Sequence, residues 1–324
     1  MGRLVKKRVM LKRAVSIILL LFVLFALFQY LYTGSPEDLP KKNSLEVIAH
    51  RGVHHDFHRE NLDDHTCTAS RIYKPTHSYI ENTIESIQAA FDFGATIVEI
   101  DIRPTKDKQL VVFHDDGLEC RTDGKGKVWD SSLDDLRKLD IGYGYTYDGG
   151  KTYPFRGKGI GKIQTLDEVL NRFPGKRFLI HNKNGKDMEV ARMIVDSLSS
   201  LPKTQRYNIY LWTNNESYAY IHELVPAVTR LFLPRDQQKK FFKSYIFGFG
   251  LGDVANEYRN KGLGLPIEYT KYVWGWPYRF LGKIYNAKAR FYVFVNTKEE
   301  LEKVAGIPLD GIVTDHIEVL GNFL

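Results

Sequence analysis

The chain has 324 residues, of which 43% are hydrophobic and 26% are charged, and this composition is typical of a globular protein. The formal net charge is +7, but residues 1–32 hold six basic residues and no acidic ones. The rest of the chain has 40 basic and 39 acidic residues, so we expect no nucleic-acid partner. The length exceeds that of an ordinary domain but fits a single α/β barrel.

The first segment combines a basic tail, residues 1–13, with an apolar run, residues 14–32, interrupted chiefly by Ser16 and Gln29. A helix of this length nearly matches a hydrocarbon core of about 30 Å. The basic flank predicts an uncleaved signal anchor that crosses the membrane once. It places the N-terminus in the cytoplasm and the folded domain outside, in a periplasmic or extracellular location. A cleaved signal peptide is the alternative, although its apolar region is usually shorter and ends at small residues.

Beyond the anchor, residues 33–44 are polar, contain two prolines and predict a linker. Strand and helix patterns then alternate. The predicted strands are 45–49, 96–101, 110–113, 177–182, 207–212, 229–233, 291–295 and 311–314, with a weaker one at 265–268. The predicted helices are 83–93, 131–138, 165–172, 187–199, 215–223, 236–243, 252–261 and 297–304. This alternation predicts an α/β fold, a (β/α)8 TIM barrel over residues 45–324, with the seventh strand left open between 245 and 290.

Two long segments break the alternation. Residues 53–80 form a His-rich insertion after the first strand, and residues 142–163 are rich in Gly, Tyr and Lys. In a barrel both would be loops on the carboxyl-terminal face, where the active site lies. The histidines of the insertion are His54, His55, His58, His65 and His77. Nothing nearby completes a metal site around them, so we interpret this segment as a solvated loop.

The chain has two cysteines, Cys67 in the insertion and Cys120 in the loop after the third predicted strand. An exported domain permits a disulfide between them, since both loops would lie on the same barrel face. Two unpaired thiols are the equally weighted alternative.

Charged and titratable side chains cluster at the ends of the early strands. His50-Arg51-Gly52 follows the first strand, Glu81-Asn82-Thr83 opens the first helix of the barrel, Glu99-Ile100-Asp101 closes the second strand, and His114-Asp115 follows the third. Two histidines, two close carboxylates and an arginine supply a general base, a general acid, a cation site and an anion clamp. This combination suits hydrolysis of a charged ester.

The order and spacing of these motifs resemble the glycerophosphodiester phosphodiesterase family, whose signature continues with Glu-x-Lys on the fourth strand. The resemblance covers about residues 45–320 and includes Arg121–Gly124, Tyr153–Ile160, Thr165–Leu170 and Asp310–Asp315. It implies a phosphoric diester hydrolase that cleaves glycerophosphodiesters to glycerol phosphate and an alcohol. The alternatives are a phospholipase D- or C-like hydrolase of intact membrane lipids and a catalytically weak phosphodiester-binding module.

The resemblance implies proton-transfer roles for His50 and His114, with His50 as the base and His114 as the acid. Both titrate near neutrality, as such roles require. Arg51 presents several planar donors and suits phosphate recognition. Its alternative role is a buried ion pair with Glu81.

Glu99 and Asp101 lie two residues apart, so their side chains point to the same side of a strand. The resemblance implies that they bind a divalent cation, Ca²⁺ or Mg²⁺, for which oxygen ligands are suited. A carboxylate pair bridged to Lys or Arg is the alternative. Glu81 would contribute to the cation site, orient Arg51 or only cap its helix.

The fourth strand departs from the family pattern, because Ile180-His181-Asn182-Lys183 stands where Glu-x-Lys is expected. Lys183 is in place to bind phosphate, but His181 replaces the glutamate expected to bind the metal. An imidazole ligand favours a borderline metal such as Zn²⁺ or Mn²⁺ over Ca²⁺. Substitution by Asn182 or a water, weak metal binding, and a one-residue shift of the alignment are the alternatives.

Overall fold

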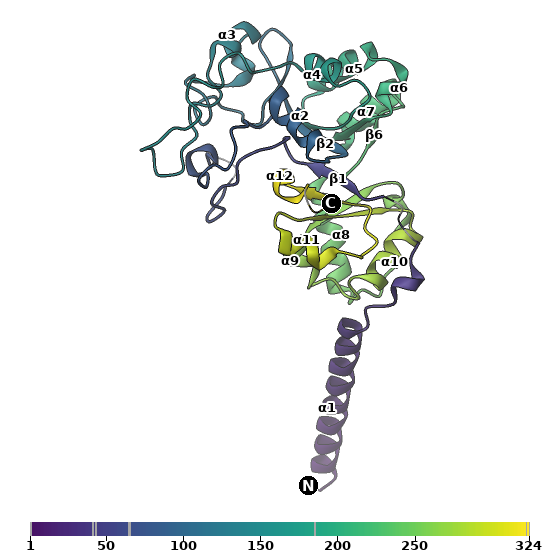
Figure 1. The fold of residues 1–324 in the computed structure, drawn as a ribbon. Coiled ribbons are helices and arrows are strands. Elements are labelled where there is room, and N and C mark those ends of the chain that lie inside the picture. The colour runs from purple at the N-terminus through teal and green to yellow at the C-terminus, as the bar shows by residue number, and fades with distance from the viewer. Residues whose placement is uncertain are drawn as a thin grey trace.

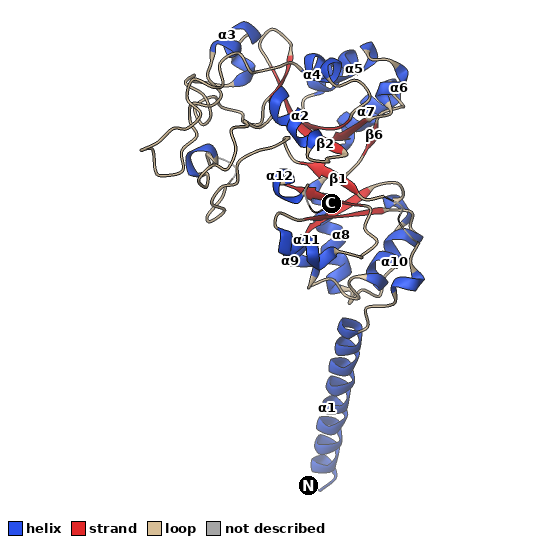
Figure 2. Cartoon of the chain, in the orientation of Figure 1, coloured by secondary structure: helices blue, strands red, loops and turns tan. Residues whose placement is uncertain are grey.

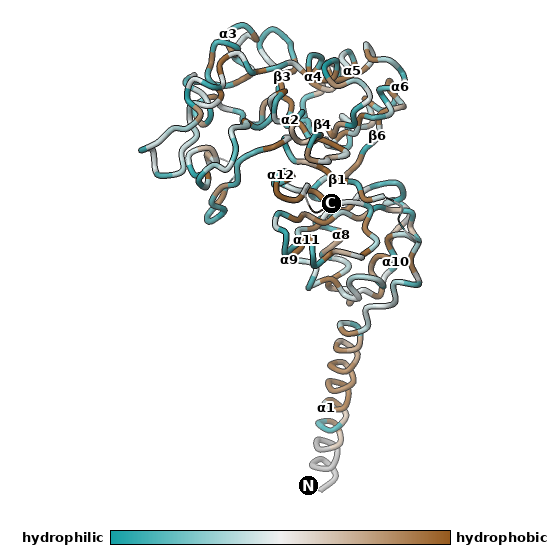
Figure 3. Tube along the Cα trace, in the orientation of Figure 1, coloured by the Kyte–Doolittle hydropathy of each residue, from teal (hydrophilic) through white to brown (hydrophobic). Residues whose placement is uncertain are grey.

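The computed structural model describes residues 2–40, 42, 44–63, 66–184, 186–321 and 323, so His65 and residues 41 and 43 of the predicted linker lie outside it. Helix α1 (Gly2–Leu31) stands away from the rest of the chain (Figure 1). It is continuous, so the basic tail and the apolar run share one helix. Among the described residues it is the one helix long and apolar enough to cross a membrane, over Met10–Leu31, and its hydrophobic run is visible in Figure 3.

Eight parallel strands form the barrel in the described part of the chain. In sheet order they are β6 (Thr229–Arg230), β5 (Ile209–Trp212), β4 (Arg177–Asn182), β2 (Ile97–Pro104), β1 (Glu46–Ala49), β9 (Gly311–Thr314), β8 (Arg290–Phe294) and β7 (Gly262–Pro266). The ring closes beyond β6, where the Gly262 N–H donates to the Leu231 carbonyl and the Leu233 N–H donates to the Gly262 carbonyl. The predicted TIM barrel is confirmed, and β7 fills the seventh place.

Helices alternate with the strands and surround them (Figure 2). They are α2 (Ile84–Asp92), α4 (Leu166–Arg172), α5 (Met188–Ser200), α6 (Lys203–Arg206), α7 (Asn215–Leu224), α8 (Arg235–Phe247), α9 (Ile267–Thr270), α10 (Tyr278–Asn286), α11 (Lys298–Val304) and α12 (Ile317–Leu320). The predicted helix 252–261 is wrong, since this segment holds only the short turn η4 (Asn256–Tyr258). Val254 and Tyr258 pack into the core from irregular backbone. Because they are four residues apart, their apolar pattern in the sequence is the same as that of a helix.

The run 110–113 is not a strand of the barrel, contrary to the sequence-based expectation of a parallel strand. Strand β3 (Leu110–Val112) pairs antiparallel with β2. The two strands are joined by residues 105–109, where the Lys108 N–H donates to the Thr105 carbonyl and Lys108 has φ +58°. A parallel neighbour needs a connection of about a dozen residues or more, so this short turn permits only a hairpin.

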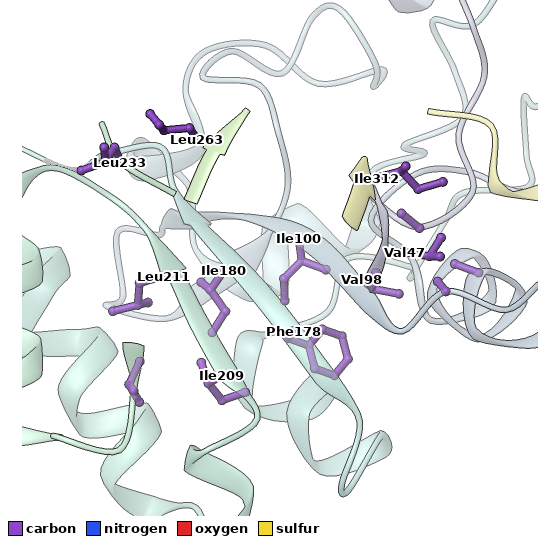
Figure 4. Packing of buried hydrophobic residues seen from close by; sticks show 14 of the residues in the cluster. Val47, Val98, Ile100, Phe178, Ile180, Ile209, Leu211, Leu233, Leu263 and Ile312 are labelled. Carbon is purple, nitrogen blue, oxygen red and sulfur yellow. The ribbon is translucent and has the colours of Figure 1, made fainter. Parts of the chain in front are cut away.

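Alternate residues of the barrel strands enter two different cores. Ile97 and Leu179 point into the barrel, where they pack with Tyr292. Val98 and Phe178 point outward to the helices (Figure 4). The strand period of two therefore decides which side chains reach the barrel interior.

The two segments that break the alternation fold together beside the barrel mouth. Their shared hydrophobic core also includes side chains from residues 110–141, among them α3 (Leu133–Lys138). We call residues 53–80 and 110–163 together the insertion unit. This core comprises Ala69, Ile72, Ile80, Val111, Phe113, Leu118, Val128, Leu136, Ile141, Tyr145, Phe155 and Ile163. A Cys67–Cys120 disulfide joins its two halves, so the paired interpretation of the cysteines holds.

Candidate active site

Three titratable side chains meet at the mouth of the barrel. Glu99 and Asp101 continue the inward row of β2 and are 1% and 0% exposed. Asp101 is in register with His181 on β4. The His181 Nδ1 lies 3.3 Å from Glu99 Oε1 and 3.2 Å from Asp101 Oδ1, and its ring stacks on Trp212. Two neighbouring strands therefore bring one nitrogen and two oxygens within 4.8 Å of one another.

These three atoms fit a divalent cation. Glu99 Oε1, Asp101 Oδ1 and His181 Nδ1 are buried and have no hydrogen-bond partner among the described residues. The other carboxylate oxygens are held, because the Arg51 N–H donates to Glu99 Oε2 at 3.0 Å and the Asn82 side chain donates to Asp101 Oδ2 at 3.2 Å. Two carboxylates this close repel unless a cation or proton lies between them. The donor set of imidazole and carboxylate suits a divalent metal.

Arg51 reaches this group through a sharp turn after β1. Arg51 and Gly52 both have positive φ, +60° and +75°. A Cβ on Gly52 would lie 2.6 Å from the Ser86 Oγ and 2.9 Å from the Ser86 carbonyl carbon, so the turn requires glycine. The Arg51 guanidinium then lies 3.0 Å from Glu81 Oε1 and 3.3 Å from Asp101 Oδ2.

Glu81 lies between two arginines. Its Oε2 accepts a hydrogen bond from Arg121 at 3.1 Å, and Arg121 also lies 2.9 Å from Asp115 Oδ2. Burial alone would raise the pKa of Glu81, but the charges of Arg121 and Arg51 hold it far below its usual value. Within the described residues, Glu81 is not part of the group formed by Glu99, Asp101 and His181. Glu81 therefore contacts Arg51, which is the contact expected from the alternative in which Glu81 orients Arg51.

His50 follows β1 and is held by a carboxylate from the last strand. Its Nδ1 lies 2.7 Å from Asp315 Oδ1, and His54 Nε2 lies 3.1 Å from the same oxygen. Burial and the Arg51 charge lower the pKa of His50, but Glu99 and Asp315 outweigh them, and the pKa is raised overall. With Nδ1 bonded to Asp315, Nε2 is left for proton transfer.

His114 is held in the same way from the β3 side. Its Nδ1 lies 2.6 Å from Asp115 Oδ1, and its Nε2 lies 3.1 Å from the Lys183 ammonium. Lys183 also lies 3.5 Å from Asp101 Oδ1. Burial, followed by the Arg51 charge, lowers the pKa of His114 to about 4. The ring is therefore neutral at pH 7, and Nε2 accepts a hydrogen bond from Lys183.

The supporting residues Arg121, Asp115 and Asp315 were not assigned roles from the sequence. Arg121 and Asp315 lie in segments that carry the family resemblance, Arg121–Gly124 and Asp310–Asp315. That resemblance was the one signal that pointed to them. Their contacts become visible only when the chain is folded.

A cleft of about 1170 Å³ lies between the barrel mouth and the insertion unit. Arg51 and Lys183 line it from the barrel, and His114, Tyr143 and Arg156 line it from the insertion unit. The Arg156 guanidinium lies 4.0 Å from the centre of the Tyr143 ring. Five arginine or lysine side chains and four carboxylates line this cleft, so it offers cationic groups to an anionic ligand.

Comparison with known proteins agrees with this arrangement. The Glycerophosphoryl diester phosphodiesterase family matches residues 50–319. A glycerophosphodiester phosphodiesterase of Caldanaerobacter subterraneus is 26% identical over 245 residues, which cover 75% of this chain and 92% of that relative.

Two solved structures share the fold. The glycerophosphoryl diester phosphodiesterase domain of Rv2277c from Mycobacterium tuberculosis has a TM-score of 0.63 and 16% identity, over 87% of this chain and 99% of that one. An Oleispira antarctica phosphodiesterase, solved with the product sn-glycerol-3-phosphate, has a TM-score of 0.56 and 20% identity, over 86% and 96%. The matched span includes every predicted site residue. The chain therefore belongs to the Glycerophosphoryl diester phosphodiesterase family.

Proposed function

We propose that the chain hydrolyses glycerophosphodiesters to glycerol phosphate and an alcohol, with His50 and His114 as the proton-transfer groups. One observation carries this proposal. Each histidine is bonded through Nδ1 to its own carboxylate, Asp315 or Asp115, which leaves Nε2 for chemistry. The two rings flank buried groups that fit a cation, so a phosphate placed there would have a proton acceptor and a proton donor at hand.

Arg51 and Lys183 would bind the phosphate, since both line the cleft. A divalent cation held by Glu99, Asp101 and His181 would offset the phosphate charge, and the nitrogen ligand favours Zn²⁺ or Mn²⁺ over the Ca²⁺ or Mg²⁺ implied by the family.

In the proposed reaction His50 removes a proton from the nucleophile, whose oxygen attacks the phosphorus as the bond to the leaving alcohol breaks. Attack by water gives glycerol phosphate directly, whereas attack by the glycerol hydroxyl gives a cyclic phosphate that water opens in a second step. His114 then protonates the oxygen of the leaving alcohol. Lys183 now donates to His114 Nε2, and burial and the Arg51 charge lower the pKa of that ring, with a smaller contribution from Lys183. A bound phosphate would draw Lys183 away and raise the pKa of His114 by its negative charge, so that the ring could carry the proton.

We also propose that α1 crosses the membrane with its N-terminus in the cytoplasm and the barrel outside. The basic residues lie on the N-terminal side of the apolar run, as the positive-inside rule requires. The Cys67–Cys120 disulfide suits an oxidising compartment. A phosphatase reporter fused to the C-terminus should be active outside the cytoplasm, and cytoplasmic activity would contradict this topology.

The position of the cleft favours a small, water-soluble diester over an intact membrane lipid. In Figure 1 the insertion unit, marked by α3, lies at the opposite end of the molecule from α1. The insertion unit lines the cleft. A cleft held away from the bilayer suits a substrate that arrives from solution.

The test uses the full-length protein in nanodiscs, with Mn²⁺, Zn²⁺, Ca²⁺ or Mg²⁺ added. We expect release of glycerol phosphate from glycerophosphocholine, and a fall in kcat of about 10²–10⁴-fold in His50→Ala and His114→Ala. His58→Ala, at an exposed histidine of the insertion unit, is the matched control and should keep full activity.

Two outcomes would overturn the proposal. Faster cleavage of phosphatidylcholine vesicles than of glycerophosphocholine would favour the phospholipase alternative. A wild-type protein that binds glycerol phosphate but is as inert as both histidine variants with all four metals would be a binding module.

A further inference from the structure

Large apolar side chains are exposed on the flank of the barrel from which α1 extends. Helix α8 ends at Phe247, which is 80% exposed, and Leu251 shortly after it is 57% exposed. Between them, Phe249 is only partly exposed and has φ +53°. We call residues 247–251 the apolar loop. Exposed aromatic and aliphatic side chains gathered in one short loop indicate a surface that another apolar phase covers.

The apolar loop packs against α1. The Phe249 ring lies 5.4 Å from the Phe22 ring, centre to centre, and 6.4 Å from the Phe25 ring. Trp274 packs on Phe249 at 5.4 Å and on Tyr30 at 6.2 Å. The loop therefore lies alongside the C-terminal half of the apolar run.

Polar contacts fix this placement at the end of α1. The Arg279 guanidinium donates to the Gln29 side chain at 2.6 Å and to the Gln29 carbonyl at 2.7 Å. The Arg279 N–H donates to the Thr33 carbonyl at 2.6 Å. Gln29 is buried, whereas most of α1 is exposed. This explains a polar residue in the apolar run, and it shows that α1 and the barrel have complementary surfaces.

The contact with Phe22 sets the depth of the loop. Phe22 precedes Leu31 by nine residues, which is about 13 Å along a helix at 1.5 Å per residue. Tyr30 and Tyr32 close the run, where aromatic side chains mark the membrane–water interface. If α1 spans the membrane, the Phe249 ring lies well below that interface, within reach of the acyl chains.

We propose that the apolar loop inserts into the outer leaflet beside α1, so that the barrel rests on the bilayer through the α8–α10 flank. This rests on the proposed membrane span of α1. Exposed Phe247 and Leu251 then contact lipid, as do the exposed leucines of α1 at the same depth.

The charges of α8 agree with this orientation. Lys243 lies one helical turn before Phe247, and Lys239 and Lys240 lie about a turn further back, all three exposed. From the apolar loop back along α8, apolar side chains are therefore succeeded by lysines. An interfacial segment has this arrangement, with apolar groups in contact with acyl chains and cations in contact with lipid phosphates.

The test measures depth in the full-length protein, reconstituted in vesicles of phosphatidylcholine and phosphatidylglycerol. Single cysteines carrying a nitroxide label replace Phe247 or Leu251. The two native cysteines form a disulfide, so only the new thiol reacts. Leu20→Cys on α1 reports whether the helix spans, and Ile160→Cys, at a 59% exposed apolar residue of the insertion unit, is the aqueous control. Power-saturation electron paramagnetic resonance compares collisions with oxygen, enriched in lipid, and with a water-soluble nickel chelate.

We expect the oxygen-to-nickel ratio at residues 247 and 251 to be several-fold above that at 160 and close to that at 20. A ratio at 247 and 251 equal to that at 160, with residue 20 in lipid, would overturn the loop insertion and leave the span intact. A ratio at residue 20 equal to that at 160 would overturn the span and the insertion together. Low collision rates with both reagents at 247 would indicate a protein contact, such as a second copy of the chain, and would also overturn the inference.

Discussion

Two clusters of buried charge lie side by side at the barrel mouth, and they differ in how their charges are satisfied. The paired cluster comprises Arg51, Glu81, Asp115 and Arg121. The open cluster comprises Glu99, Asp101 and His181. In the paired cluster each charged group faces an opposite charge within 3.1 Å. In the open cluster, Glu99 has no ammonium or guanidinium nitrogen within 4.0 Å in the described part of the chain, and two oxygens and one nitrogen lie within 4.8 Å of one another.

This difference indicates that the paired cluster supports the structure and that the open cluster is suited to bind a cation. Removing one member of a buried ion pair costs several kcal/mol because it leaves the other charge unpaired, so the joint between barrel and insertion unit depends on every member of the paired cluster. The open cluster lacks such closure, and a cation from solution would supply it. Substitutions of Glu81 and Arg121 should therefore act mainly on stability, whereas Arg51 also lines the cleft and Asp115 also holds His114. Substitutions in the open cluster should act on metal binding and rate.

The largest effect on activity and metal binding is expected in the open cluster, for Glu99→Gln. The new side chain keeps an oxygen that can accept from the Arg51 N–H but loses the charge that would bind the cation. We expect kcat and metal affinity to fall by at least about 100-fold. Loss of a residue that supports a metal ligand typically lowers affinity or activity by about 10–100-fold, and loss of the ligand itself should cost more. Activity assays and calorimetric titration with Mn²⁺ measure this, and the thermal midpoint should hardly change. Retention of wild-type metal affinity would show that the open cluster is not the cation site.

In the paired cluster, Glu81→Gln should lower the free energy of unfolding by about 3–5 kcal/mol, because it leaves two buried arginines without their shared partner. Urea denaturation measures the loss, and Mn²⁺ affinity should stay within a few-fold of wild type. The matched control is Glu85→Gln on the next turn, at an exposed pair with Lys162, where less than about 1 kcal/mol is expected. A large drop in metal affinity with little loss of stability would place Glu81 among the metal ligands.

A smaller change is expected for His181→Glu, which restores the family's carboxylate. The site would then offer oxygens alone, so its preference should move from Zn²⁺ or Mn²⁺ toward Ca²⁺ or Mg²⁺, by about tenfold or more in the ratio of Kd values. His181→Gln is the control: it removes the imidazole without restoring a charge, so it should weaken binding of all four metals more than His181→Glu does. An unchanged order in His181→Glu would mean that residue 181 does not select the metal.

The two clusters also show how far sequence reasoning reaches. The strand period predicted that Glu99 and Asp101 point to the same side, and the family resemblance placed His181 at the corresponding position of the fourth strand. The open cluster could be predicted because its members sit on regular strands in register.

The paired cluster could be predicted only in part. Arg121 comes from the insertion unit, 40 residues beyond Glu81, and no local pattern shows which carboxylates it meets. Asp315 likewise comes from the far end of the chain to hold His50. The run 110–113 misled because a hairpin strand and a barrel strand have the same apolar pattern, and only the five-residue connection distinguishes them.

His316 provides a last contrast, since it also lies between two carboxylates but each of its nitrogens has its own partner. Nδ1 lies 3.2 Å from Glu318 Oε1, and Nε2 lies 3.4 Å from Asp56 Oδ2. Burial lowers the pKa of His316, but the bonds to Asp56 and Glu318 outweigh it and raise the pKa to about 9.

Because the folded pKa lies above the unfolded value of about 6.5, the protonated ring stabilises the fold fully below that pH and loses its contribution as pH rises through about 9. His316→Asn should therefore cost about 1–3 kcal/mol at pH 6, discounted for partial exposure, and progressively less as the pH rises from about 6.5 to about 9. Urea denaturation of both proteins across this range measures the difference. A cost that is the same at pH 6 and pH 10 would show that His316 acts through packing and not through charge. The contrast between His316, whose charge is satisfied by two carboxylates, and His181 would then not hold.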